Sequence, residues 1–338
     1  MSLVTKALVL REKNGIPTVE DFPLPAMRNN QVAVKIHAAA LNHRDVWIQQ
    51  GLYAKIQYPA IVGSDGCGYV SDVSEGVSES LIGQRVILHP SLMWGDDIKA
   101  QSNNFHVLGM PTYGTFAHHC IVDADRVYAA PSYLSDAECA ALPLAGLTAW
   151  RALMTQGKAQ SHHKVLITGI GGGVALCAAQ CALALGAEVW VTSGSQDKIT
   201  MAQSIGAQGG ILYSEPDFGK SLMKSMGGFD IIVDGTGGET FNHALEAIKP
   251  GGTIVIYGAT AGTPNNVNIH RIFWKQVHII GSTMGNDNDF AEMLAFVTQH
   301  RIKPIIAKTL YLEQGAEAFR YLQSGAQTGK VVLLMENM

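Results

Sequence analysis

A glycine-dense segment in the middle of the chain constrains the fold more than any other feature. Residues 164–192 read KVLITGIGGGVALCAAQCALALGAEVWVT, in which a short apolar strand leads into four glycines within five positions. A helix of small and apolar residues and a second strand follow. In such a βαβ unit a pyrophosphate lies on the free N–H groups at the helix N-terminus, and glycines let the backbone approach it closely. Because other α/β proteins also have glycine-rich turns, the two flanking strands are what favour a dinucleotide site here.

Strands and helices alternate after this segment, whereas strands and turns dominate before it. The alternation predicts a parallel sheet covered by helices on both faces, and the earlier part predicts a small β domain. In the β part we expect strands at 5–10, 31–36, 60–73, 85–88 and 115–122, followed by a helix at 135–155. In the parallel sheet we expect strands at 165–168, 188–192, 210–213, 230–234 and 253–257, and helices at 195–205, 217–226 and 239–248. The last part is expected to hold helices at 289–300 and 312–324 and a strand at 330–334.

The composition excludes several classes of protein. The 338 residues are 47% hydrophobic and 15% charged, which is typical of a folded protein large enough for two domains. A net charge of −4 without a basic run offers no surface for nucleic acid. Five scattered cysteines without a CxxC pair fit a reducing compartment, so we expect a cytoplasmic protein. The apolar stretch 171–191 contains Gln180 and a Leu-Gly-Ala break, which fit a buried helix and a strand, so no membrane span is expected.

The end of the second strand of the βαβ unit indicates the cofactor. A carboxylate at this point binds the ribose 2′-hydroxyl of NAD, whereas a basic environment accepts the 2′-phosphate of NADP. Here the strand runs into Ser193-Gly194-Ser195 with no acid at its tip, and Lys198 follows. Asp197 is better interpreted as a first-turn residue that interacts with the helix dipole. Lys198 alone would be an ordinary exposed lysine, but together with the missing acid it favours NADP(H).

Several motifs, in order along nearly the whole chain, point to one known family. They are LNHRD at 41–45, GSDG at 63–66, GTFA at 114–117, ALPLAGLTA at 141–149, the glycine turn, and GKVVL at 329–333. In this combination they resemble the medium-chain dehydrogenase/reductase superfamily. The resemblance implies an α/β fold in which a Rossmann doubly wound parallel sheet is inserted into a GroES-like β-barrel domain. It implies a GroES-like domain at 1–130, a nucleotide-binding domain at 131–264, a return to the first domain at 265–338, and a homodimer formed through the nucleotide domain.

Positions that bind zinc in part of this family carry other residues here. Zinc-dependent members have a cysteine at Asn42, a His-Glu pair at Ser64-Asp65, and four close cysteines in the region of the loop 89–113, which contains none. Zinc prefers nitrogen and sulfur ligands, for which asparagine and serine are poor substitutes. A rival ligand set can be drawn from His43, His89, His106, His118, His119 and Cys67. Because His118 and His119 would point to opposite faces of a strand, they cannot easily share one metal, and we predict no metal site.

The zinc-free, quinone oxidoreductase-like branch of the family implies the site residues. Asn42 and Tyr53 match an asparagine and a tyrosine that lie beside the nicotinamide, and Trp47 shares the substrate cleft. The implied cofactor contacts are Thr148, Gly172, Gly173, Val174, Ser193, Gly194, Lys198, Tyr213, Tyr257 and Gly258. The third glycine of the fingerprint falls on Ala175, which the pattern tolerates. This alignment leaves the roles of Gly169 and Gly171 open.

These features together predict an NADPH-dependent oxidoreductase that transfers a hydride, without zinc, to a quinone, an enone or a related carbonyl compound. Asn42 and Tyr53 would polarise or position the carbonyl group, with Trp47 and Trp94 as an apolar wall. Two alternatives stay open: a zinc-dependent alcohol dehydrogenase, and a non-catalytic dinucleotide-binding protein on the same fold. The loop 89–113 is also open to two interpretations, a pocket wall or a pinned surface loop, and its large residues are Met93, Trp94, Phe105 and Met110.

Overall fold

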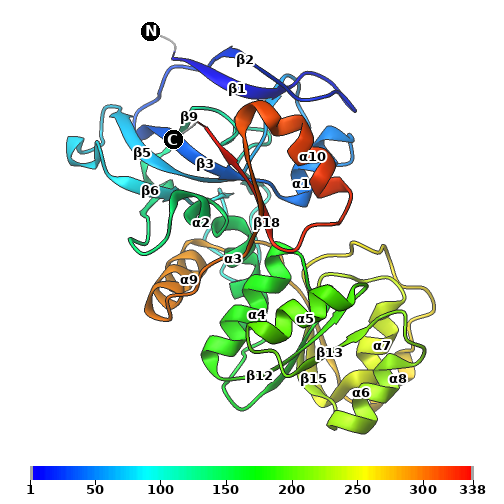
Figure 1. Cartoon of the computed structure of the whole chain (residues 1–338). Coiled ribbons are helices and arrows are strands. Elements are labelled where there is room, and N and C mark those ends of the chain that lie inside the picture. The colour runs from blue at the N-terminus through cyan, green and yellow to red at the C-terminus, as the bar shows by residue number, and fades with distance from the viewer. Residues whose placement is uncertain (1–2, 336–338) are drawn as a thin grey trace. The chain divides into compact units, whose positions relative to one another are not determined.

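The computed structural model describes residues 3–335, and the chain divides into two compact units (Figure 1). Unit 1 consists of the described residues up to Ala145, of Asn286–Leu294, and of the described residues from Lys303 onward. Unit 2 consists of Gly146–Gly285 and Ala295–Ile302. Two helices cross the division, namely α3 (Pro143–Trp150) and α9 (Asp287–Gln299).

Unit 1 is built mainly from β-strands. Within the described residues its largest sheet has seven strands in the order β10-β6-β5-β3-β18-β17, with β9 paired to β3. A second sheet has the order β2-β1-β4, and β7 pairs with β8. The strands are β1 (Val4–Leu10), β2 (Thr18–Pro23), β3 (Gln31–Ala40), β4 (Ala60–Ile61), β5 (Asp65–Val73), β6 (Arg85–Leu88), β7 (Ser91–Leu92), β8 (His106–Val107), β9 (His119–Asp123), β10 (Val127–Ala129), β17 (Ile306–Tyr311) and β18 (Lys330–Leu334). The helical segments are α1 (His43–Gln49), η1 (Glu79–Leu81), η2 (Ala124–Arg126), α2 (Asp136–Ala140), η4 (Leu312–Gln314) and α10 (Gly315–Gln323).

Strand β3 shows why this part of the sequence forms a sheet. Val32, Val34 and Ile36 recur at every second position, so their side chains point to one face, where each is at most 1% exposed. They join a core that also contains Phe319 of α10 and Leu333 of β18. The strand continues beyond residue 36, where we expected it to end, because its last three residues pair with both β18 and β5.

The end of the chain returns to the first sheet of unit 1. β18 pairs antiparallel with the end of β3 and parallel with β17, so strands from both ends of the chain share one sheet. This arrangement confirms the expected GroES-like β domain formed by both chain ends. β18 has the expected bounds, whereas β17 was not expected. Most residues of β17 are half-buried at the edge of the sheet, so it lacks the apolar alternation by which a strand is identified.

Unit 2 is a parallel sheet with the strand order β13-β12-β11-β14-β15-β16. This is the order of doubly wound dinucleotide-binding folds, and it confirms the predicted fold class. The strands are β11 (Lys164–Ile167), β12 (Glu188–Ser193), β13 (Gly209–Leu212), β14 (Phe229–Asp234), β15 (Ile248–Ile256) and β16 (His278–Gly281). The helices are the π-helical η3 (Arg151–Gln156), α4 (Gly173–Leu185), α5 (Gln196–Ser204), α6 (Phe218–Met226), α7 (Thr240–Ala247) and α8 (Ile269–Trp274). β16 was not expected, because it is an edge strand whose side chains are mostly exposed.

The apolar stretch 171–191 forms a buried helix and a strand, as expected. α4 has 13 residues and ends at Gly186, whose φ of +92° is the left-handed conformation that glycine adopts without strain. Ala178 and Ala182 are fully buried, and α4 contacts β11 and β12. Among the residues that the structure describes, no helix is long and apolar enough to cross a membrane.

The division into units lies later in the chain than the boundaries 130/131 and 264/265 that we expected. Residues after 130 stay with unit 1 because α2 is fastened to its sheet by Asp136. This carboxylate accepts a hydrogen bond of 2.7 Å from Arg85 of β6 and lies 3.0 Å from Nδ1 of His37 in β3. Residues after 264 stay with unit 2 because β16 extends the parallel sheet beside β15.

The loop 89–113 is fastened to its own unit by its large side chains. Trp94 is buried, its ring lies 5.4 Å from that of Phe105 in an edge-to-face arrangement, and its Nε1 donates to the carbonyl of Asp97. Met110 belongs to the core of unit 1, and Met93 is the exposed member of the set. These contacts favour the interpretation of a pinned loop.

Candidate active site

The glycine turn between β11 and α4 forms an anion-binding helix terminus in unit 2. Gly169 and Gly171 have φ values of +64° and +131°, so each holds a conformation that other residues rarely adopt. Gly172 is the N-cap of α4, which has no side-chain cap, and no heavy atom lies within 4 Å of a Cβ placed there. The N–H groups that open α4 are therefore available to a pyrophosphate. The fully buried Ala175 stands one turn further along the helix.

Lys198 leans onto this glycine turn from the first turn of α5. A Cβ at Gly171 would lie 2.6 Å from Cδ and 3.3 Å from Nζ of Lys198, so the lysine side chain lies directly over this glycine. Burial of the ammonium lowers the pKa of Lys198 below its ordinary value. The turn and the lysine together concentrate positive potential at the carboxyl end of the sheet.

The tips of β12 and β13 complete the same end of the sheet. Ser193 is buried and donates to the carbonyl of Ile170 at 3.3 Å, which ties the tip of β12 to the glycine turn. The hydroxyl group of Tyr213 lies against Gly194, where any side chain would collide with it. The described residues at this tip, Ser193-Gly194-Ser195, include no acid. Of the predicted cofactor residues, Ser193, Gly194, Lys198 and Tyr213 thus gather around one strand end.

Asp234, at the end of β14, is a buried carboxylate that sequence reasoning missed. Its Oδ1 accepts from the hydroxyl of Thr168 and from the N–H of Thr236 at 3.0 Å, while its Oδ2 has no partner within the described residues. The predicted Tyr257 and Gly258 follow β15, and the Tyr257 ring lies against Gly235. Asp234 could have been found from the sequence, because it is an acid at the end of an apolar strand of the parallel sheet. Ligands bind at the carboxyl ends of such strands.

Thr148, another predicted cofactor residue, is buried in α3. Its hydroxyl group lies 3.8 Å from the sulfur of Met284, a weak acceptor that also belongs to unit 2. Gly173 and Val174 are the first two residues of α4 and are half-buried. The predicted contacts therefore occupy helix and strand ends of unit 2.

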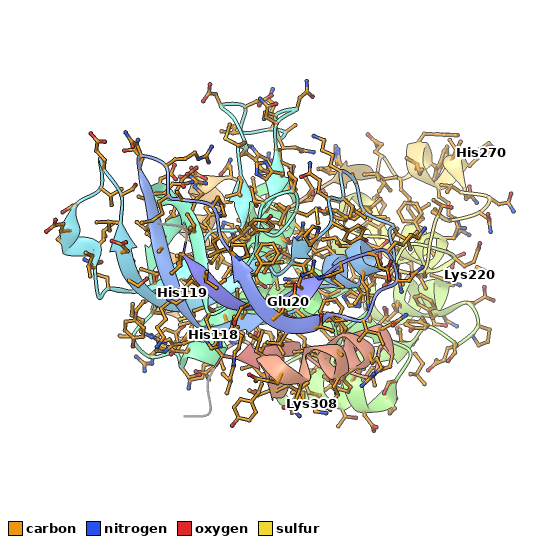
Figure 2. The ribbon with its side chains drawn as sticks, turned by 90° about the horizontal axis from the view of Figure 1, so that it is seen from above. Glu20, His118, His119, Lys220, His270 and Lys308 are labelled. Atoms are coloured by element: carbon orange, nitrogen blue, oxygen red, sulfur yellow. The ribbon has the colours of Figure 1, made fainter. Side chains whose placement is uncertain are left out.

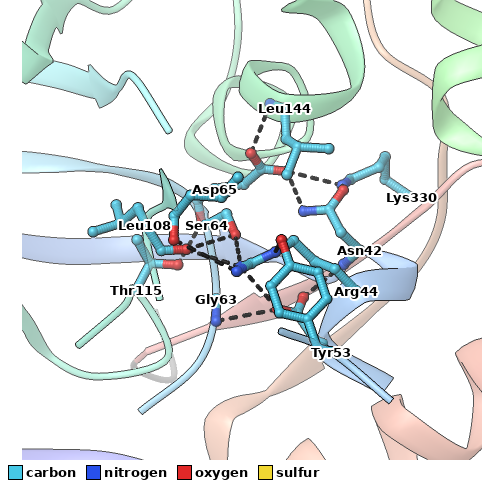
Figure 3. Close-up of polar contacts among 12 residues, drawn as sticks. Asn42, Arg44, Tyr53, Gly63, Ser64, Asp65, Leu108, Thr115, Leu144 and Lys330 are labelled. Atoms are coloured by element: carbon cyan, nitrogen blue, oxygen red, sulfur yellow. Dashed lines mark hydrogen bonds and ion pairs between the residues drawn. The ribbon is translucent and has the colours of Figure 1, made fainter. Parts of the chain in front are cut away.

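A buried lysine lies at the centre of a polar cluster in unit 1 (Figure 3). Lys330, the first residue of β18, is 5% exposed, and its Nζ donates to Oδ1 of Asn42 at 2.6 Å and to Oδ2 of Asp65 at 2.9 Å. The amide nitrogen of Asn42 donates to the same Asp65 oxygen at 2.9 Å. The other oxygen of Asp65 accepts the backbone N–H of Leu144 at 2.7 Å. Each buried charge in this group is therefore paired and hydrogen-bonded, as burial requires.

Arg44, from the first turn of α1, is the second buried cation of the cluster. Its Nη1 donates to the Ser64 hydroxyl at 2.5 Å and to the carbonyl of Leu108 at 2.9 Å, and Ser64 donates to the same carbonyl at 2.8 Å. Its Nε donates to the hydroxyl of Tyr53 at 3.3 Å, and Cζ lies 4.7 Å from the centre of that ring. Figure 3 shows the Arg44 side chain between Ser64 and Tyr53.

Asp45 is the carboxylate beneath Arg44. It is fully buried, accepts from the backbone N–H of Asn42 at 2.8 Å and of Gly63 at 3.3 Å, and lies 3.8 Å from Nη1 of Arg44. Burial raises the pKa of Asp45 to about 6, although Arg44 and the N–H of Asn42 favour the charged form. The cluster thus holds two basic side chains, Arg44 and Lys330, and two carboxyl groups, Asp45 and Asp65, of which burial raises the pKa of Asp45 to about 6.

The three residues predicted for the substrate side take different positions. Tyr53 is half-buried against the core of unit 1 and has Arg44 as the donor to its hydroxyl. Trp47 is 40% exposed on α1. Asn42 is buried, and Lys330 and Asp65 engage both ends of its amide, so a single N–H remains for another partner. Its role beside a substrate stays a prediction.

No group of three or more histidine, cysteine or acidic side chains within residues 3–335 could hold a metal ion. Of the rival ligand set, His119 lies next to His118 at the start of β9, as Figure 2 shows, and its Nδ1 lies 3.5 Å from the hydroxyl of Thr5. His89 lies 3.1 Å from Asp287, which is also paired with Arg126.

Arg44 and Lys330 were not singled out as functional residues from the sequence. Both lie within motifs that we quoted for the family resemblance, LNHRD and GKVVL. Lys330 could have been noticed because it is the first residue of an otherwise apolar strand. A lysine at such a position is rarely buried without a partner, so a carboxylate beside it was to be expected.

Comparison with known proteins identifies the family. The family described as alcohol dehydrogenase GroES-like domain matches residues 28–132, and the family described as zinc-binding dehydrogenase matches residues 173–299. The chain is 35% identical to the zinc-type alcohol dehydrogenase-like protein YogA of Leptosphaeria maculans, covering 91% of this chain and 92% of that protein. It is 28% identical to the quinone oxidoreductase of Mus musculus (93% and 92% covered) and 27% identical to the acryloyl-coenzyme A reductase of Sulfurisphaera tokodaii (97% and 99% covered).

A solved structure agrees over the whole length. The crystal structure of an NAD-dependent alcohol dehydrogenase matches with a TM-score of 0.92 at 33% identity, covering 99% of this chain and 100% of that one. The shared architecture, the two family matches and the relative of 35% identity show that the chain belongs to the medium-chain dehydrogenase/reductase superfamily of oxidoreductases.

Proposed function

We propose that this oxidoreductase is an NADPH-dependent reductase that works without zinc and acts on quinones, enones or related carbonyl compounds. The observation that carries the proposal is the buried Lys330 ammonium, which engages Asn42 and Asp65 at two of the positions where zinc-dependent relatives have ligands. The comparisons support an oxidoreductase of this superfamily.

The residues present do not fit a zinc ion. Zinc would need deprotonated sulfur, neutral imidazole or carboxylate ligands with one open position. Asn42 is neutral and Ser64 is held by Arg44, while both oxygens of Asp65 already accept hydrogen bonds. A divalent ion placed here would also meet the fixed positive charge of Lys330. The name of the family that matches residues 173–299 refers to zinc, and the donor set of this chain argues against it.

The preference for NADPH over NADH is supported by the tip of β12. NADPH differs by a phosphate on the adenosine ribose, which a hydroxyl and ammonium environment accepts and a carboxylate repels. Ser193, Lys198 and Tyr213 supply that environment at this tip. The glycine turn and the N-terminus of α4 would hold the pyrophosphate, and Thr148, Tyr257 and Gly258 would contact the remainder. The bound cofactor supplies the hydride of the reaction.

The substrate class is supported by the donor that the cluster offers to a substrate oxygen, namely the Tyr53 hydroxyl, which accepts a hydrogen bond from Arg44. A quinone becomes a hydroquinone, or an enone a saturated ketone, when it takes one hydride and one proton from solvent. Negative charge then develops on a carbonyl oxygen, which a tyrosine hydroxyl stabilises by hydrogen bonding. Tyr53 is our candidate for that donor, and Trp47 for an apolar contact. The quinone oxidoreductase and acryloyl-coenzyme A reductase among the relatives act on compounds of this kind, as their names state.

A turnover assay with metal analysis tests the proposal. Purified protein would be assayed for NADPH and NADH oxidation with panels of quinones, enones and aldehydes, and its zinc content would be measured by elemental mass spectrometry. We expect a kcat/KM at least about tenfold higher with NADPH than with NADH, and full activity after chelation. Near-stoichiometric zinc lost together with activity would establish a zinc-dependent alcohol dehydrogenase instead. Tight NADPH binding without turnover on any panel would establish a non-catalytic binding protein.

We also propose a homodimer through β16, one of the two edge strands of the parallel sheet within the described residues. An edge strand offers unpaired backbone groups, and a second copy related by a two-fold axis can pair with it. Trp274 is 83% exposed, and its neighbour Phe273 and Ile279 of β16 are exposed as well, so this part of unit 2 offers large apolar side chains to a partner. Light scattering should give twice the chain mass, and the variant Ile279→Lys/Trp274→Glu should give one chain mass. Ile16→Lys, at an exposed site in unit 1, is the control that should stay dimeric.

The proposed location is the cytoplasm. The five cysteines, all within the described residues, form no disulfide, which fits a reducing compartment. Fractionation of cells that produce the protein would check this expectation.

A further inference from the structure

We propose that Arg44 is a positioning residue for the reduction: its guanidinium fixes the Tyr53 hydroxyl as a hydrogen-bond donor toward the substrate and supports the negative charge that develops there. The inference rests on the proposed function, and it adds a residue that neither the sequence analysis nor the comparisons assigned. Its physical basis is the direction of one hydrogen bond and the charge behind it.

The Arg44–Tyr53 hydrogen bond determines what the phenol can do. Arginine has donors but no acceptor and stays charged, so at Nε it can only donate to the Tyr53 oxygen. The phenol proton must then point to another acceptor, and Tyr53 has no second hydrogen-bond partner within residues 3–335. Tyr53 is half-buried, and its oxygen accepts from Arg44 while its own proton stays available. The hydroxyl can therefore donate to the carbonyl oxygen of a substrate.

The charge of Arg44 strengthens that donation as the reaction proceeds. Hydrogen bonds in a chain polarise one another, so a phenol that accepts from a cation becomes a better donor. The guanidinium also lies over the face of the Tyr53 ring, with Cζ 4.7 Å from its centre, and thus restrains the ring as well as the hydroxyl. The stabilisation is larger when the substrate oxygen carries negative charge, and a difference of this kind between ground state and transition state raises kcat.

The surroundings of Arg44 hold the guanidinium in place. Nη1 is fixed by the Ser64 hydroxyl and the Leu108 carbonyl, and the carboxylate of Asp45 lies 3.8 Å away. Arg44 is itself buried, so it cannot swing into solvent. These contacts also allow a purely structural role, in which Arg44 only anchors the loop at Leu108. The two roles make different predictions for a double-mutant cycle.

The experiment compares Arg44→Lys in the wild-type protein and in Tyr53→Phe, using the best quinone or enone acceptor. Lysine keeps the charge but lacks the fork that reaches Tyr53 and Ser64 together. For the positioning role we expect Arg44→Lys to lower kcat about tenfold, with kcat calculated per NADPH-binding site, and to change KM less than about threefold. In the Tyr53→Phe background the same substitution should change kcat less than about twofold, because the hydroxyl through which it acts is gone. Equal factors in the two backgrounds would overturn the proposal and leave a structural anchor.

A matched control and a second variant keep the result interpretable. Arg85→Lys alters another partly buried arginine of unit 1 that is paired with a carboxylate and two carbonyls but does not touch Tyr53. Arg85→Lys should change kcat by the same factor in the wild-type protein and in Tyr53→Phe. Should Arg44→Lys not fold, Arg44→Gln replaces it, since glutamine can still donate to the Leu108 carbonyl. An Arg44→Gln variant with wild-type kcat would overturn the proposal equally.

Failure of the inference is distinguishable from failure of the proposed function. If the wild-type protein oxidises NADPH with no quinone, enone or aldehyde, the proposed function is wrong. If turnover is present and depends on Tyr53 but the Arg44 effect is the same with and without the hydroxyl, the function stands and the role of Arg44 is structural.

Discussion

Removal of the Lys330 ammonium tests whether the charged cluster of unit 1 depends on mutual pairing. In Lys330→Met the side chain keeps its apolar length and loses its charge, so the fully buried Asp65 keeps only the Asn42 amide and the Leu144 N–H as donors. The oxygen of Asn42 is left without a donor as well. Breaking a buried ion pair by removing one partner costs about 3–5 kcal/mol, and Lys330 is only 5% exposed, so a value of about 3 kcal/mol or more is expected.

The double variant separates the pairing from the packing. Lys330→Met/Asp65→Asn removes both charges, and replacement of a complete buried pair by neutral groups is close to neutral in other proteins. We therefore expect Asp65→Asn alone to cost about as much as Lys330→Met, and the double variant to recover most of the loss. Two single losses of about 3 kcal/mol each and a double variant close to the wild type give a coupling free energy of about 5–6 kcal/mol, well above the value expected for independent sites.

The assay must report unit 1 alone, because a chain with two units does not unfold in one step. Hydrogen exchange of β3 and β18 peptides, followed by mass spectrometry at increasing urea, gives the free energy of opening for that sheet. β14 peptides of unit 2 serve as an internal control and should not change. If the double variant loses as much free energy as the two single variants added together, Lys330 and Asp65 are not a coupled pair and the reasoning is refuted.

Two further changes probe the cofactor site and the pH dependence. Lys198→Met should raise the KM for NADPH by about tenfold and leave that for NADH within about twofold, measured by initial rates, because in the proposed site the ammonium acts on the 2′-phosphate. Equal changes for both cofactors would contradict this assignment. Burial raises the folded-state pKa of Asp45 to about 6, so the unfolded chain loses this proton at a lower pH than the folded chain. The stability linked to this proton, about 3 kcal/mol, is present below about pH 4 and is lost as the pH rises past about 6. Asp45→Asn removes this dependence, so urea titrations of unit 1 should show the variant gaining on the wild type between pH 4 and pH 7, and parallel curves would contradict the assignment.

The fold was predictable where burial leaves a clear pattern. β14 is buried along nearly its whole length and therefore has a continuous apolar run, and β3 has valine or isoleucine at every second position from Val32 to Ile36. β16 and β17 are edge strands with exposed or half-buried residues, and neither has a periodic pattern. Their existence follows from the neighbouring strand that each pairs with, which a single sequence does not reveal.

The candidate site was predictable in its glycines and not in its charges. The glycine turn is local, so its four glycines and the flanking strands can be identified together. The contact of Asn42 with Lys330 joins residues that are 288 positions apart. It exists because Val332 pairs with Ala40, which places the start of β18 beside the residues that follow β3. A register of this kind is set by the whole sheet, so the lysine that engages the Asn42 amide could not be anticipated from either motif alone.

The balance of charge in unit 1 bears on which reactions such a site can support. A zinc ion binds an alcohol directly and promotes loss of its proton, which the oxidation of simple alcohols requires. In this cluster the two cations are monovalent and are already matched by Asp45 and Asp65, so neither can bind an alkoxide without separating a buried pair. In the proposed mechanism the support for the negative charge on the substrate oxygen is a hydrogen bond from Tyr53, whose hydroxyl accepts from Arg44. Such a bond suffices when conjugation spreads the new charge over a quinone or an enone, and it is weak support for a localised alkoxide. The same charge balance that argues against zinc therefore favours conjugated acceptors over simple aldehydes and alcohols.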